Sequence, residues 1–307
     1  MGTPEIAVPS LHALMSFPGC SLQAVYTQPD RPFGRKKRLT PSPVKVAAEA
    51  CRIPVNNPMS VKAEEAIEEL RQLQPDLIIV CAYGQILPQA LLDIPLIGCF
   101  NLHFSFLPRW RGASPVHTAI RAGDDHTGVC LQKVVFKLDA GPIAAYSPKE
   151  PIHPADTYSM LAERLSHISA KLLTQTLPLL CNQTFKLKAQ NESDVTYCHT
   201  IKKEAGCIQW EQESAVEIER KLRAFTPWPG IYTFDAKGKR LQITKVEIRY
   251  GLSLPAGFVQ PELVIGTSCD AIRVIALKPE GKKEMAADEF LRGHSHLVGT
   301  KLQLNKL

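Results

Sequence analysis

The stretch GCFNLHFSFLPRWRGASP, residues 98–115, decides how the rest of the chain is interpreted. Its first eight residues are mostly apolar and predict a buried strand. Asn101 and His103 are two residues apart, so on a strand their side chains point to the same face. A stiff, basic turn with two prolines and two arginines follows directly. The stretch therefore predicts a strand that delivers an amide and an imidazole into one cleft.

Strand-like and helical segments alternate through the first 180 residues on both sides of this stretch. Strands are expected at 21–28, 76–83, 98–105 and 127–135, and helices at 61–73 and 156–180. In the last helix, Leu161, Leu165 and Leu172 fall on one face. This alternation predicts an α/β domain with a doubly wound, mostly parallel sheet.

The last third of the chain has a different pattern. Polar residues gather around 182–200, and short strand-like segments separated by Gly and Pro follow them. Such segments predict a small β-rich barrel. We therefore expect an α/β domain over 1–181, a linker over 182–200 and a β-rich domain over 201–307.

Composition and motifs exclude several classes of protein. Hydrophobic residues make up 45% of the 307 residues, and the apolar run LIIVCAYGQIL is shorter than the roughly 20 residues that cross a bilayer. Nine cysteines without a CxxC pair indicate reduced thiols, and no signal peptide is visible, so we expect a cytoplasmic protein without a membrane partner. Neither GxSxG, GxGxxG nor GxxxxGK[ST] occurs. The histidines lack paired ligand spacing, so no metal is expected.

One carboxylate could join Asn101 and His103. Asp139, in KLDAGPI, follows the next predicted strand and could reach both residues at the carboxyl ends of the sheet. Together these groups suit acyl transfer, with donors for an oxyanion and a base for an amine proton. Spacing alone leaves open a buried histidine with an ordinary hydrogen bond.

A basic loop lies near the N-terminus. PDRPFGRKKRLTPSPVK, residues 29–45, contains Arg35, Lys36, Lys37 and Arg38, with no acidic residue from 31 to 38. A solvated loop explains these charges, and so does an arm that contacts phosphates.

The segments NLHFSFLPRWRGASP and KLDAG resemble the folate-dependent formyltransferase family. Asp139 follows Asn101 by 38 residues, and this interval also fits the pattern of that family. The core motif of that family is N-x-H-x-S-L-L-P-x-x-R-G. Further segments are similar to family members that act on methionyl-tRNA, among them TQPDRPFGRKKRLTPSPVK, TYCHTIKKEAGCIQW and RAFTPWPG. The resemblance runs from Gly2 almost to the C-terminus.

The resemblance implies a formyltransferase fold and an OB-like C-terminal domain that binds tRNA. Nothing in the sequence demands more than a monomer, so a monomer is expected. It implies transfer of a formyl group from the co-substrate 10-formyltetrahydrofolate to the amino group of methionyl-initiator tRNA, in the bacterial cytosol or an organelle matrix. It assigns catalysis to Asn101, His103 and Asp139. It assigns folate contact to Ser105, Phe106, Leu107 and Pro108, and tRNA contact to Arg35, Lys36, Lys37 and Arg38.

The chain departs from the family at several places. Phe104 stands where a small residue or proline is usual, and Pro142 stands where many relatives carry Asp. Phe106 stands where the motif has its first leucine. Relatives also place an apolar strand before Gly2, which is central in a doubly wound sheet, and this strand is missing here. We therefore expect Met1 to be an internal methionine, or the chain to be truncated at its N-terminus.

Three other functions remain open on the sequence. One is a formyltransferase that acts on a sugar-nucleotide amine, which shares the N-x-H…D core. Another is a 10-formyltetrahydrofolate hydrolase or dehydrogenase domain, which normally continues into further modules. The third is an inactive tRNA-binding remnant, which the missing strand favours and the intact trio opposes.

Overall fold

The computed structural model describes residues 1–34 and 38–304, which form two compact units. Unit 1 comprises Met1–Pro115, His126–Pro151 and Leu161–His199. Unit 2 comprises Val116–Asp125, Ile152–Met160 and Thr200–Leu307. Residues 182–199, which include most of the segment predicted to be a linker, therefore pack as part of unit 1.

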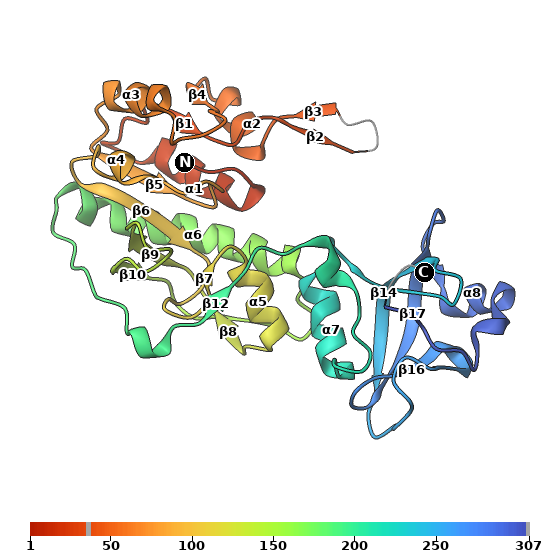
Figure 1. Ribbon diagram of the computed structural model, residues 1–307. Coiled ribbons are helices and arrows are strands. Elements are labelled where there is room, and N and C mark those ends of the chain that lie inside the picture. The colour runs from red at the N-terminus through yellow and green to blue at the C-terminus, as the bar shows by residue number, and fades with distance from the viewer. Residues whose placement is uncertain (35–37, 305–307) are drawn as a thin grey trace. The chain divides into compact units, whose positions relative to one another are not determined.

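Unit 1 alternates helices with short strands along the chain (Figure 1). Its helices are η1 (Glu5–Ala7), α1 (Val8–Ser16), α2 (Pro43–Ala50), α3 (Glu64–Gln72), α4 (Gln89–Leu92), most of α6 (Tyr158–Cys181) and η2 (Glu192–Asp194). Its strands are β1 (Val25–Tyr26), β2 (Arg31–Phe33), β3 (Arg38–Thr40), β4 (Val55–Asn56), β5 (Leu77–Val80), β6 (Gly98–His103), β7 (Arg111–Gly112), β8 (His126–Thr127), β9 (Cys130–Lys133), β10 (Ile143–Tyr146), β11 (Glu150–Pro151) and β12 (Tyr197–Cys198).

The main sheet of unit 1 is mixed and has the order β10-β9-β6-β5. Strand β6 runs parallel to β5 and antiparallel to β9, and β10 is antiparallel to β9. A separate parallel pair joins β1 and β4. The predicted α/β class is confirmed. The predicted face of the long helix is also confirmed, because Leu161, Leu165 and Leu172 are all buried in α6.

Met1 and Gly2 bridge the β1–β4 pair and the main sheet of unit 1. The Met1 amino group donates to the Ile79 carbonyl oxygen at 2.7 Å, and the Cys81 N–H donates to the Met1 carbonyl at 2.8 Å. On the other side, the Gly2 N–H donates to the Tyr26 carbonyl at 2.9 Å. Burial lowers the pKa of the Met1 amino group to about 6. The chain thus enters unit 1 in the position of a parallel strand between β1 and β5.

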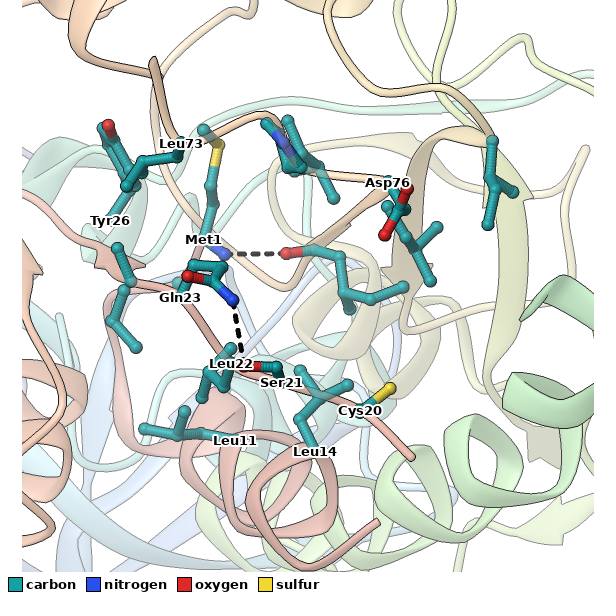
Figure 2. A pocket seen from close by; sticks show the side chains of 18 of the residues that line it. Met1, Leu11, Leu14, Cys20, Ser21, Leu22, Gln23, Tyr26, Leu73 and Asp76 are labelled. Atoms are coloured by element: carbon teal, nitrogen blue, oxygen red, sulfur yellow. Dashed lines mark hydrogen bonds between the residues drawn. The ribbon is translucent and has the colours of Figure 1, made fainter. Parts of the chain in front are cut away.

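A cavity of about 620 Å³ continues from Met1 between β1 and β5 (Figure 2). Its lining includes the side chains of Leu11, Leu14 and Tyr26. Because the Val25 and Thr27 N–H groups donate to the β4 side, the peptide groups of alternate residues in β1 face the cavity. The shape of this cavity, called the slot, fits one extended strand.

Unit 2 contains an antiparallel sheet. Its strands β13 (Ile231–Phe234), β14 (Arg240–Arg249), β17 (Ala271–Pro279), β16 (Val264–Gly266) and β15 (Val259–Gln260) lie in that order, and β18 (Met285–Ala286) pairs with β17. Its helices are α5 (Pro115–Ala122), the first turn of α6, η3 (Lys203–Gly206), α7 (Ala215–Ala224), η4 (Pro261–Leu263), α8 (Ala287–Gly293) and η5 (Ser295–Leu297). The predicted β-rich C-terminal domain is confirmed.

A capping box and two buried polar contacts organise unit 2 around α7. Ser214 and Glu217 form a capping box at the start of this helix. The buried Lys221 ammonium pairs with Glu213 at 2.8 Å and also donates to the Cys207 carbonyl. Trp210, 1% exposed, donates from Nε1 to the Thr233 hydroxyl at 3.1 Å. These contacts attach the helix and the segment before it to the sheet.

The slot predicts that an added strand stabilises unit 1. We expect an extension of about five β-branched and aromatic residues before Met1 to raise the melting temperature by about 5 °C or more, because each strand hydrogen bond contributes about 0.5–1.5 kcal/mol. Thermal unfolding followed by circular dichroism measures this. A Gly/Ser extension of equal length is the control, and equal melting temperatures for both would contradict the interpretation of the slot.

Candidate functional site

Strand β6 presents Asn101 and His103 on one face of the main sheet. Phe100 and Leu102, which alternate with them, are 0% and 1% exposed and pack in the core. Asn101 lies between Val80 of β5 and Gln132 of β9 in the strand register. The predicted common orientation of the amide and the imidazole follows directly from this pairing.

The imidazole of His103 is held from its Nε2 side. Nε2 lies 2.9 Å from the carbonyl oxygen of Trp110. Because a carbonyl oxygen only accepts hydrogen bonds, we assign the proton of the neutral ring to Nε2. Nδ1 then faces Asp139 Oδ2 at 3.7 Å, a distance too long for a hydrogen bond but within range of an ion pair. Nδ1 is therefore the nitrogen at which His103 can exchange a proton.

Asp139 reaches His103 by a route that differs from the expected one. Strand β9 is antiparallel to β6, so its carboxyl end lies at the opposite edge of the sheet from His103. The chain turns back after β9, and Asp139 adopts a left-handed conformation with φ 46°. Its Oδ2 accepts a hydrogen bond from the Gly112 N–H at 2.8 Å. The structure places Asp139 beside His103, although the strand direction assumed for Asp139 is wrong. The catalytic roles of Asn101, His103 and Asp139 stay predictions.

The segment 186–198 closes the site from outside the sheet. Strand β12 pairs in parallel with β7, and the Thr196 carbonyl accepts from the Arg111 N–H at 2.9 Å. The side chain of Arg111 is fully buried, and it donates from Nη2 to Glu192 at 2.7 Å and from Nε to Gln190 at 2.9 Å. These hydrogen bonds, from Arg111 first and then from Lys137, lower the pKa of Glu192 to about 2.

The turn after β6 has a fixed conformation. The Ser105 hydroxyl donates to the Arg109 carbonyl at 2.5 Å, and the Tyr146 hydroxyl donates to the Leu107 carbonyl at 2.9 Å. The Leu107 side chain packs with Cys130 and Ile143, whereas Phe106 is partly exposed. Folate contact by Ser105, Phe106, Leu107 and Pro108 stays a prediction, and this packing leaves Phe106 as the side chain best placed to touch a ligand.

The basic loop is described in part. Arg38 begins β3 and is exposed, in a hairpin with β2 (Figure 1). Arg35, Lys36 and Lys37, which the sequence also assigns to tRNA contact, lie outside the described residues. At the base of the hairpin Lys45 pairs with Asp30 at 2.9 Å. Of the four basic residues assigned to tRNA contact, the structure thus describes Arg38.

The described residues contain neither a metal-binding cluster nor a helix that could span a membrane. Across 1–34 and 38–304, no three His, Cys, Asp or Glu side chains are arranged to hold a metal ion. In the same part of the chain, no helix has the length and apolar character needed to span a bilayer. The slot is lined by none of Asn101, His103 and Asp139, so it is separate from this site.

Comparison with known proteins decides the family. A family model described as "Formyl transferase" matches residues 11–177, more than half of the chain. The chain belongs to the formyl transferase family. A second model, "Formyl transferase, C-terminal domain", matches residues 200–295 of this family member.

Two relatives and one solved structure are similar to this chain over most of their length. The chain is 41% identical to a methionyl-tRNA formyltransferase of Macrococcus caseolyticus, covering 98% of this chain and 97% of the relative. It is 42% identical to one of Geobacillus thermodenitrificans, covering 99% and 97%. An N-formyltransferase from Helicobacter canadensis, solved with folinic acid and dTDP-3-aminofucose, has a TM-score of 0.65 and 20% identity, covering 89% and 96%. This last likeness shows the shared fold.

Three residues that contact Asp139 were not identified from the sequence. Gln132 and Gln190 are single carboxamides without a motif, and Gly112 belongs to a turn read only as basic and stiff. One signal was available for Gln132, since a polar residue interrupts the apolar run of its strand. Gln190 gave no such signal, because it lies among polar residues.

Gly112 is predicted to tolerate no side chain. It has φ 125°, and an added Cβ would lie 2.0 Å from the Cys198 carbonyl oxygen. We expect Gly112→Ala to separate β12 from β7 and to lower the free energy of unfolding by about 2 kcal/mol or more. Urea unfolding measures the change. Gly293→Ala, where an added Cβ meets nothing within 4 Å, is the control. Equal stability of the two variants would contradict the described backbone contact.

Proposed function

We propose that the chain transfers the formyl group of 10-formyltetrahydrofolate to the α-amino group of methionyl-initiator tRNA. The observation that carries the proposal is 41% and 42% identity, over nearly the full chain, to two relatives named methionyl-tRNA formyltransferase. The arrangement of Asn101, His103 and Asp139 supports it, because amide, imidazole and carboxylate groups suit transfer of an acyl group to an amine.

In the proposed reaction, the neutral amine attacks the formyl carbon and the carbonyl electron pair moves onto oxygen. The Asn101 amide donates a hydrogen bond to this oxyanion, and protonated His103 donates a second from Nδ1. Asp139 accepts the proton that the amine loses. When the tetrahedral intermediate collapses, N10 of tetrahydrofolate leaves and takes up the proton held by Asp139, which returns to its carboxylate form. Ser105 to Pro108 contact the folate from the turn that follows β6.

The proposal includes the partners and the location. Arg38, together with Arg35, Lys36 and Lys37, binds the phosphate backbone of the tRNA, and the C-terminal domain contributes further contacts. The protein acts as a monomer in the compartment where initiator tRNA is used, the bacterial cytosol or an organelle matrix. Residues 1–181 carry the chemistry and residues 201–307 contribute to tRNA binding.

A second candidate acceptor is the amine of a sugar nucleotide. The similar fold of the Helicobacter canadensis enzyme, solved with dTDP-3-aminofucose, favours it. At 20% identity this likeness supports the fold and not the acceptor, so we rank it below methionyl-tRNA.

Acceptor choice tests the proposal directly. Formyl transfer from 10-formyltetrahydrofolate is measured with methionyl-initiator tRNA and, separately, with dTDP-3-aminofucose. We expect transfer to the tRNA and none to the sugar nucleotide. Transfer to the sugar alone would replace the proposed acceptor. Binding of tRNA without any transfer would identify a tRNA-binding remnant.

Asp139→Asn is predicted to remove the proton acceptor while keeping the size of the side chain. We expect kcat to fall by roughly 10²–10⁴-fold, the usual contribution of a positioned base, with KM values changed only a few-fold. Steady-state formylation measures both constants. Activity close to that of the wild type would contradict the assigned role of Asp139.

Arg38→Ala is predicted to weaken tRNA binding without affecting chemistry. We expect KM for tRNA to rise a few-fold, kcat to stay unchanged, and the slope of log KM against log salt to decrease by about one phosphate contact. The exposed Lys62 on the same unit supplies the control, Lys62→Ala. An unchanged KM and salt slope in Arg38→Ala would remove Arg38 from the proposed tRNA surface.

A further inference from the structure

A carboxamide is buried beside the catalytic trio. Gln132 lies in β9 with 2% exposure, directly opposite Asn101 in the β6–β9 pairing. Both side chains therefore leave the same face of the sheet. A buried amide is costly unless its donors and acceptor are used, so the partners of Gln132 indicate why it is there.

The amide of Gln132 is directed at Asp139. Its Nε2 donates to Asp139 Oδ1 at 2.7 Å, while the Gly112 N–H donates to Oδ2 at 2.8 Å. The two oxygens of this carboxylate thus have different donors, and Oδ2 is the one that faces His103 Nδ1. Without Gln132, the Gly112 N–H would hold one oxygen only.

The backbone of Asp139 is held by a second carboxamide, Gln190, which also donates to Gln132 Oε1 at 3.5 Å. Gln190 Nε2 donates to the carbonyl oxygens of Asp139 and Gly141, each at 2.7 Å. This fixes the position of the peptide but leaves the final side-chain torsion free, and that torsion is broad in an aspartate. Gln190 and Gln132 therefore act on different degrees of freedom of the same residue.

We propose that Gln132 is a positioning residue for formyl transfer: it fixes the rotation of the Asp139 carboxylate, so that Oδ2 faces His103 and the reacting amine. The inference rests on the proposed catalytic role of Asp139. Gln132 touches neither substrate in this account and acts through Asp139.

The ionisable surroundings of Asp139 make the effect readable in a pH profile. His103 faces it from β6, Cys130 from β9 and Cys198 from β12. Burial raises the pKa of Cys130 to about 12 and also raises that of Cys198, so both thiols stay neutral at working pH. Neither thiol therefore adds a charge beside Asp139.

The test compares Gln132→Met and Gln132→Glu with the wild type in steady-state formylation. Methionine has a similar length and no donor, so we expect kcat to fall roughly 10–100-fold, the effect of one hydrogen bond to a charged group. KM for both substrates should change less than about three-fold. The acid limb of the kcat profile should move to higher pH, because the carboxylate form of Asp139 loses a donor.

Gln132→Glu keeps the shape and places a second carboxyl group against Asp139. Two neighbouring carboxylates resist being ionised together, so the acid limb should move further than in Gln132→Met. In an Asp139→Asn background, Gln132→Met should lower kcat less than about three-fold further, since the group that it positions is already absent.

Controls separate this inference from stability and from the proposed function. Ser169→Ala removes a buried hydrogen bond to Ser10 at 2.8 Å and should leave the pH profile unchanged. A wild-type kcat and pH profile in Gln132→Met, beside an inactive Asp139→Asn, would overturn the positioning role alone. An active Asp139→Asn would instead overturn the function assigned to the site. If Gln132→Met does not fold, the acid limb of Gln132→Glu decides.

Discussion

The pairing of β6 with a parallel strand on one side and an antiparallel strand on the other is the constraint on which the site depends. This pairing fixes Asn101 between Val80 and Gln132, and His103 beside Cys130. It also sends the chain after β9 away from the site and makes it return, which brings Asp139 to His103 in a left-handed conformation. Strand register and one folded-back loop therefore position Asn101, His103 and Asp139.

The returning loop is kept in place by polar contacts from distant parts of the chain. Gly112 comes from the turn after β6, Gln132 from β9, and Gln190 from the segment between the two family domains. Behind them the buried guanidinium of Arg111 is paired with Glu192. A buried cation is stable only with such partners, so the segment that carries Gln190 and Glu192 stabilises the structure around Arg111.

Periodicity made part of this predictable. Asn101 and His103 share a face because of their spacing, and Leu161, Leu165 and Leu172 are buried because of theirs. The sequence predicts the wrong direction for the strand that precedes Asp139, since an apolar run looks the same in parallel and antiparallel pairing. Arg111 reads as an exposed charge in the sequence, and its burial depends on Gln190 and Glu192 about 80 residues away. Local patterns cannot contain contacts of that range.

The acceptor is a question that the fold leaves open, because enzymes for sugar nucleotides share it at 20% identity. A crystal structure with a stable analogue of 10-formyltetrahydrofolate tests most directly the proposal that formyl transfer takes place at Asn101, His103 and Asp139. The account predicts the formyl carbon within about 4 Å of the Asn101 amide and His103 Nδ1, with Asp139 Oδ2 free to meet the amine. An analogue bound with its formyl group away from all three residues would contradict it.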